Sequence, residues 1–136
     1  MSAPQSFPVP TEAALSEMLI ARGFARRRPR VWTRGCAEVL QVVHLQRSQY
    51  DPDRRYLNFA LWPLVWGAPP TPAESKMPFR TRAESLKARD MAGFFARIDG
   101  LTTLAHLAEA LAQSDIAGLV SRDLRDLLSA EHPQAQ

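Results

Sequence analysis

The 136-residue sequence contains one cysteine, three histidines and six glycines, and these low counts exclude several classes of protein. The single cysteine, Cys36, cannot form an internal disulfide or a metal site built from several cysteines, and we interpret it as an incidental turn residue. The glycines are isolated, so no phosphate-binding loop is predicted. The histidines lack the spacing of a metal site, and we predict neither a metal nor a cofactor.

Long hydrophobic runs are absent as well. No apolar stretch approaches the ~20 residues that a membrane-spanning helix requires, and the N-terminus lacks the charged-then-apolar order of a signal peptide. The sequence therefore predicts a soluble, cytoplasmic protein that does not bind a membrane. Hydrophobic residues nevertheless make up 46% of the chain, which is typical of a folded domain.

The net charge of +3 is distributed unevenly along the chain. Residues 1–50 hold seven arginines against three acidic residues, a balance of +4, whereas residues 51–136 hold ten basic against eleven acidic residues, a balance of −1. Six arginines lie within the basic segment from Arg22 to Arg34. Basic segments near aromatic residues can bind nucleic acid, although the acidic residues close to this segment reduce its positive field.

Apolar spacing in the N-terminal half predicts a helix followed by strands. Thr11 is a suitable N-cap, and Gly23 suits the left-handed conformation that ends a helix, with Phe24 folding back on the last turn. Runs rich in Val and Leu predict strands over residues 30–34, 38–48 and 55–62. Both faces of the two longer strands carry apolar residues, so we expect both faces of the sheet to be partly covered.

The C-terminal half is predicted to be a proline-rich loop over residues 67–78 and then helices. One helix is expected over 83–97, the next from Thr102 or Thr103, and the last from Ser114 or Asp115. The last helix is expected to carry a core stripe of Leu119, Leu124, Leu127 and Leu128.

This order of elements predicts a single α+β domain over residues 11–130. Its antiparallel sheet has three to five strands, with an N-terminal helix and two or three C-terminal helices packed on it. Residues 1–10 are expected to be a flexible arm, and residues 131–136 a frayed end.

Several short motifs resemble the domain of unknown function 4304 family, a set of small bacterial proteins. They are Gly23-Phe24 after the first helix, an aromatic-then-arginine pair (Trp32, Arg34), "LQRS" over residues 45–48, "YLNFALW" over residues 56–62, and Arg82. Family members commonly have glycine near Ala60, and this chain departs from that pattern. The resemblance implies a fold and a cluster of polar positions, but no activity.

Polar residues at the ends of two predicted strands form the leading candidate site. Gln46 and Ser48 share strand parity with Asn58 across the predicted hairpin, and Arg82 supplies a cation if it reaches the same patch. Amides, a hydroxyl and a guanidinium suit a carboxylate, a phosphate or a peptide backbone. The alternative is that Gln46 and Asn58 only hydrogen-bond the backbone of the proline-rich loop.

These residues rank three functions for an uncharacterised bacterial protein. The leading hypothesis is a non-enzymatic binding or protein-interaction module, similar to immunity or adaptor proteins, whose partner is a protein or a small anionic ligand. Trp62 and Trp66 beside the loop are a second possible interface. The alternative is a nucleic-acid-binding protein that uses the segment from Arg22 to Arg34; its contact residues are Arg26, Arg27, Arg28 and Arg30. The third is an enzyme, for which only His44 is a candidate.

Overall fold

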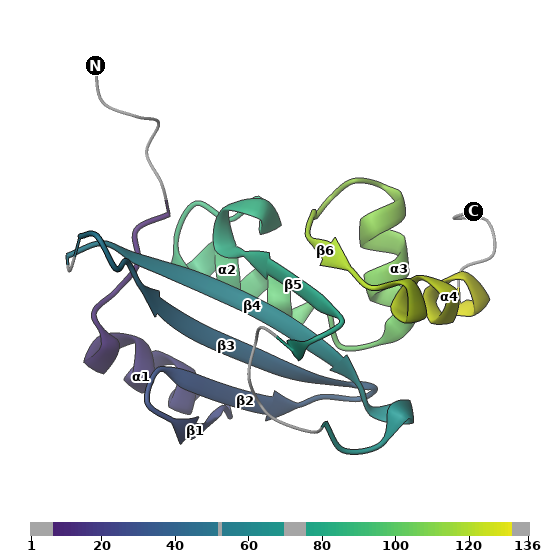
Figure 1. Cartoon of the computed structure of the whole chain (residues 1–136), viewed down its shortest axis with the longest axis horizontal. Helices are drawn as coiled ribbons and strands as arrows, with labels where there is room; N and C mark the ends of the chain where they lie inside the picture. The colour runs from purple at the N-terminus through teal and green to yellow at the C-terminus, as the bar shows by residue number, and fades with distance from the viewer. Residues whose placement is uncertain (1–6, 52, 70–75, 132–136) are drawn as a thin grey trace.

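A computed structural model describes residues 7–51, 53–69 and 76–131, which form an α+β fold built on a six-stranded antiparallel sheet (Figure 1). Strand order in the sheet follows the chain: β1 (Ala25–Arg28), β2 (Val31–Gly35), β3 (Val39–Arg47), β4 (Arg55–Pro63), β5 (Phe79–Arg82) and β6 (Leu119–Val120). The helices are α1 (Glu12–Ala21), α2 (Met91–Asp99), α3 (Leu104–Ala112) and α4 (Arg122–Glu131), with 3₁₀ turns η1 (Leu64–Trp66) and η3 (Ala83–Leu86).

The first helix begins and ends where its sequence predicts. The Thr11 hydroxyl accepts a hydrogen bond from the Ala14 amide at 3.3 Å and caps the N-terminus. Gly23 adopts a φ of 92°, and the next amide, that of Phe24, donates to the Leu19 carbonyl at 3.0 Å. This arrangement is a Schellman motif, and the buried Phe24 side chain supplies its apolar contact.

The helices cover one face of the sheet, where the main core lies (Figure 1). Alternate residues of β3, including Val43 and Leu45, face the buried side chains of the helices, because successive side chains of a strand point to opposite faces. Phe94 of α2 packs edge-on against Phe59 of β4, with ring centres 6.1 Å apart. Phe7 packs against Phe94 as well, so the described part of the predicted arm, residues 7–10, contributes to the core.

The sheet has six strands, which corrects the expected three to five. The prediction missed β1 because its residues, Ala25–Arg28, are all exposed and three of them are arginines, so the strand has no apolar alternation. It also missed β5 and β6, which have four and two residues. Arg30, expected to begin a strand, instead has a φ of 65° in the turn between β1 and β2.

The predicted helix over 83–97 is wrong in its first half. Residues Ala83–Leu86 form only a 3₁₀ turn, which ends at Lys87 with a φ of 58°. The α-helix begins at Met91, after Asp90 accepts the Gly93 amide at 2.8 Å as the N-cap. The next helix matches its prediction, because Thr103 accepts the His106 amide and caps α3.

The predicted start of the last helix is also wrong. Ser114, expected as an N-cap, has a φ of 58° at the C-terminal end of α3, where the Asp115 amide donates to the Ala110 carbonyl. Leu119 lies in β6 and is 64% exposed, so it does not belong to the core stripe. The helix begins at Arg122 after Ser121, and its buried leucines are Leu124 and Leu128.

Candidate binding site on the open face of the sheet

The second face of the sheet, called here the open face because the buried side chains of the four α-helices belong to the main core, carries a separate and smaller apolar cluster. Its buried members are Val31, Val42, Ala60 and Met77, and the half-buried Leu40 and Trp62 pack against them. None of these residues comes from α1, α2, α3 or α4, whose buried side chains belong to the main core. The open face is therefore apolar near its middle, and the polar residues that share its strand parity follow toward one end.

Asn58 and Gln46 meet at this polar end. Asn58 lies directly opposite His44 on β3, and Gln46 is one step further along the same face, opposite Tyr56. The Asn58 amide nitrogen donates to Gln46 Oε1 at 2.9 Å and lies 3.4 Å from His44 Nδ1. Asn58 is only 5% exposed, so the two amides form a fixed pair at the inner end of the site.

Arg82 reaches the same place from β5. It is the direct partner of Asn58 in the sheet register, and its guanidinium carbon lies 4.1 Å from the centre of the Tyr56 ring. Arg54 approaches the same ring at 5.9 Å. Cation–π contact holds the Arg82 guanidinium beside the amide pair without neutralising its charge.

Gln46, Asn58 and Arg82 line a pocket of about 400 Å³. Arg80, Ser85, Gly118 and the exposed Leu119 complete its polar and apolar walls. Arg80 is also the register partner of Ala60, which places its side chain on the open face beside Arg82. The structure thus brings together Gln46, Asn58 and Arg82, three of the four residues expected to form the patch.

Ser48 does not line this pocket. It follows the last residue of β3, and its hydroxyl accepts the backbone amides of Tyr50 and Asp51 at 3.2 Å each. Its amide donates to the Arg54 carbonyl, so Ser48 closes the β3–β4 hairpin turn. The parity argument assumed that Ser48 extends the strand, but β3 ends at Arg47 and Ser48 belongs to the turn.

Tyr56 and Arg80 are site residues that the expected patch omitted. Tyr56 has the same parity as Asn58 on β4, so its position was accessible from the sequence, although its role as a support for Arg82 was not. Arg80 lies two residues before Arg82 in β5, so the two side chains share one face of the strand. The sequence did not predict this position because the strand is too short and polar to be recognised.

The tryptophan pair lies at the other end of β4. The rings of Trp62 and Trp66 pack edge to face, with centres 5.4 Å apart, and Trp62 Nε1 donates to the Gly67 carbonyl at 2.7 Å. Trp62 therefore fixes the start of the proline-rich loop. The role expected of Gln46 and Asn58 as loop anchors concerns residues 67–78, of which 70–75 lie outside the described residues.

The arginines of the basic segment have separate contacts. Arg26 forms an ion pair with Glu12 at 3.4 Å, and Arg27 donates to the Thr33 hydroxyl at 2.8 Å. Arg28 ends β1, and Arg30 lies in the adjoining turn. The four arginines thus lie on one hairpin, at the edge of the sheet formed by β1.

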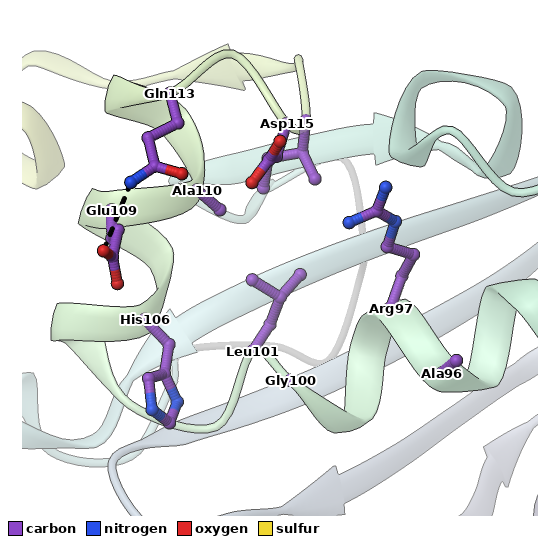
Figure 2. Close-up of a pocket in the computed structure, with 10 residues that line it drawn as sticks. Ala96, Arg97, Gly100, Leu101, His106, Glu109, Ala110, Gln113 and Asp115 are labelled. Carbon is purple, nitrogen blue, oxygen red and sulfur yellow. Dashed lines mark hydrogen bonds between the residues drawn. The ribbon is translucent and has the colours of Figure 1, made fainter.

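A second pocket, of about 360 Å³, lies between the end of α2 and α3 (Figure 2). Arg97 and Asp115 stand on opposite sides of it, and Gln113 donates to Glu109 on its rim at 3.3 Å. Its polar side chains are charged or solvated surface groups, and none is buried. Within the described ranges, no cluster of three or more His, Cys, Asp or Glu side chains forms a metal site.

The fold defines a small α+β protein with helices over one face of a six-stranded antiparallel sheet. The model of the family described as "Domain of unknown function (DUF4304)" matches residues 15–129, and the chain belongs to this family. Searches of curated proteins and of solved structures gave no match. Across the described ranges, no helix has the length and apolar character needed to cross a membrane.

Proposed function

We propose that this protein is a non-enzymatic binding module that holds an anionic group of its partner at the polar end of the open face. The observation that carries the proposal is that Arg82 is held in place beside the pocket but has no acidic partner among the described residues. Its guanidinium is held on Tyr56 beside a pocket, and no acidic side chain in the described part of the chain forms an ion pair with it. A carboxylate or phosphate would supply the missing charge-assisted hydrogen bonds.

The composition of the site favours binding over bond-making chemistry. A guanidinium and two amides orient a ligand through hydrogen bonds and charge, and none of them is a strong nucleophile at neutral pH. His44 contacts the Asn58 amide and is placed to orient it. The partner is therefore a small anionic ligand or a protein that presents an acidic group, as expected of an immunity-like or adaptor-like module.

Nucleic-acid binding through the basic segment is the weaker proposal. Arg26 and Arg27 already have protein partners, and Tyr56 has a guanidinium over its ring, which limits base stacking there. This alternative predicts binding of a single-stranded oligonucleotide that weakens steeply as salt rises and that is lost when Arg26, Arg27 and Arg28 are all changed to glutamine. An oligonucleotide that fails to bind at low salt would eliminate it.

The direct experiment is a titration of the ¹⁵N-labelled protein with inorganic phosphate and with acetate. We expect shifts in the side-chain amide signals of Gln46 and Asn58. Arg82→Gln is expected to lower the affinity for each anion by about tenfold, because the site loses its cation. Arg89→Gln is the matched control, since Arg89 is exposed and outside this pocket. Unchanged spectra with both anions, or equal loss in the two variants, would overturn the proposal.

A further inference from the structure

The pocket between the end of α2 and α3, called here the α2–α3 pocket, has walls of opposite charge (Figure 2). Arg97, in the last turn of α2, forms one wall. The facing wall is formed by α3 and the segment after it, which carry His106, Glu109 and Asp115. The pocket shares no lining residue with the anion site on the open face, so it is a separate place on the molecule.

The two charges that face each other across this pocket have no protein partner. In the part of the chain that the structure describes, the side chains of Arg97 and Asp115 form no ion pair or hydrogen bond, either with each other or with a third residue. Both side chains are only partly exposed. Glu109, in contrast, accepts the Gln113 amide at 3.3 Å. A charge that loses part of its hydration without gaining a partner is unfavourable, so a ligand that pairs with both groups would relieve both.

The backbone holds the two charges apart. The Gly100 amide donates to the Arg97 carbonyl at 3.1 Å where α2 ends. On the facing wall, the Asp115 amide donates to the Ala110 carbonyl at 2.9 Å, directly after Ser114 with its φ of 58°. Because these bonds fix the bases of both side chains, the gap between the charges is set by the fold.

The lining between the charges is apolar. Leu101 and Ile116 are 3% and 4% exposed, and the half-buried Ala110 lies beside them. Such a surface favours an apolar group on the ligand. A cation in the last turn of a helix also interacts favourably with the helix dipole, which suits Arg97, but the dipole accounts for neither Asp115 nor the apolar lining.

We propose that the α2–α3 pocket binds a zwitterion, namely an α-amino acid with a free ammonium, a free carboxylate and an apolar side chain. The ligand carboxylate pairs with the Arg97 guanidinium, and the ligand ammonium pairs with the Asp115 carboxylate. The ligand side chain covers Leu101 and Ile116. A ligand with only one charge would leave one of the facing groups unpaired. The volume of about 360 Å³ suits a ligand of this small size.

The test compares four probes that differ in one group, using isothermal titration calorimetry of the full chain at neutral pH, where histidine side chains carry little charge. Leucine carries all three groups, 4-methylpentanoate lacks the ammonium, 3-methylbutylamine lacks the carboxylate, and glycine lacks the side chain. We expect leucine to bind about tenfold or more tightly than each of the others, because each of them loses one charge pair or the apolar contact.

Two variants assign the charges of the ligand to the two walls. Arg97→Gln is expected to weaken leucine binding by about tenfold or more and to leave the binding of 3-methylbutylamine unchanged, because this amine has no carboxylate to lose. Asp115→Asn is expected to weaken leucine binding equally and to leave 4-methylpentanoate unchanged. A purely structural role would not produce this crossed pattern. Circular dichroism verifies that both variants fold, which we expect because neither side chain bonds another described residue.

The matched controls are Arg122→Gln and Asp126→Asn, at exposed positions of α4 outside the pocket, and both should bind leucine as the wild type does. A lack of leucine binding, or equal binding of leucine and any of the other three probes, would overturn the inference. The side-chain amide signals of Gln46 and Asn58 report anion binding at the other site. A failure here therefore leaves the proposed function standing, and a failure there leaves this inference standing.

Discussion

Gln41 shows at the scale of one residue how a polar side chain connects distant segments. It is fully buried on β3, and its amide nitrogen donates to the Ile98 carbonyl at 2.7 Å and to the Leu101 carbonyl at 3.3 Å. Its oxygen accepts two hydrogen bonds from Arg34. Gln41 therefore supplies a hydrogen-bond donor to the carbonyl groups at the end of α2, and it orients Arg34, which pairs with Asp99.

Gln41→Leu is predicted to destabilise the protein by about 1–3 kcal/mol, because buried carbonyl and guanidinium groups lose a partner while the volume changes little. Urea unfolding followed by circular dichroism measures the change. Gln113→Leu, at an exposed position whose amide bonds only Glu109, should shift stability by less than about 0.5 kcal/mol. Equal effects of the two changes would mean that the buried bonds of Gln41 are not important for stability.

Position 118 requires glycine because two backbone segments approach each other closely there. A Cβ atom at this position would lie 2.7 Å from the Arg80 carbonyl oxygen and 2.9 Å from Phe79 Cε1. Gly118→Ala is therefore predicted to cost about 1–3 kcal/mol by displacing β6 from β5. Gly35→Ala is the control, since no heavy atom lies within 4 Å of its added Cβ, and it should be nearly neutral. Thermal unfolding of the two variants compares them, and similar melting temperatures would contradict the prediction.

At the scale of elements, the caps decide where the helices begin. Between β5 and α2 the chain makes a 3₁₀ turn, passes through the left-handed Lys87, and resumes at Asp90. Leu86 remains buried although it is outside the α-helix, so the apolar spacing that predicted one long helix reflects burial in both segments. A cap with a free side-chain oxygen and an extended backbone defines the real start.

Asp90→Ala is predicted to cost about 0.5–2 kcal/mol and to reduce the hydrogen-exchange protection of the Gly93 amide, because the side chain no longer accepts that amide. Arg89→Ala, one residue earlier and exposed, is expected to change stability by less than about 0.5 kcal/mol. Hydrogen exchange followed by NMR tests both variants. Full protection of Gly93 in Asp90→Ala would show that the cap is unnecessary.

At the scale of the whole molecule, aromatic packing unites the elements. Phe94 of α2 contacts Phe7, Phe59 and Phe95 with ring centres 5.8–6.1 Å apart, so one side chain joins the N-terminal segment, the sheet and the helical layer. The ion pairs of Asp99 with Arg22 and Arg34 add a polar link between α1, β2 and the end of α2. These contacts make a cooperative unit, although the half-exposed ion pairs contribute little individually.

Phe94→Ala is predicted to lower the free energy of unfolding by about 3–5 kcal/mol, since it removes a fully buried ring at the centre of the core. Tryptophan fluorescence and circular dichroism should report the same midpoint in wild type and variant, because Trp32 lies in the same core. Separate midpoints would indicate that the sheet and the helical layer unfold independently. The exposed Tyr50→Ala serves as a control and should be nearly neutral.

The sequence by itself determined the elements whose signals are local. The first helix follows from Thr11 and Gly23, the long β3–β4 hairpin from its apolar runs, and the parity of Gln46 with Asn58 from the two-residue repeat of a strand. These features depend on backbone conformations and side-chain directions that neighbouring residues set.

Only the tertiary structure decided the rest. Strands β1, β5 and β6 are too polar or too short to be recognised alone, and they exist because an adjacent strand supplies their hydrogen-bond partners. The same pairing brings Arg82 opposite Asn58 and over Tyr56, although 24 positions separate Asn58 from Arg82 in the sequence. The candidate site thus depends on contacts between segments distant in the sequence, which local spacing cannot specify.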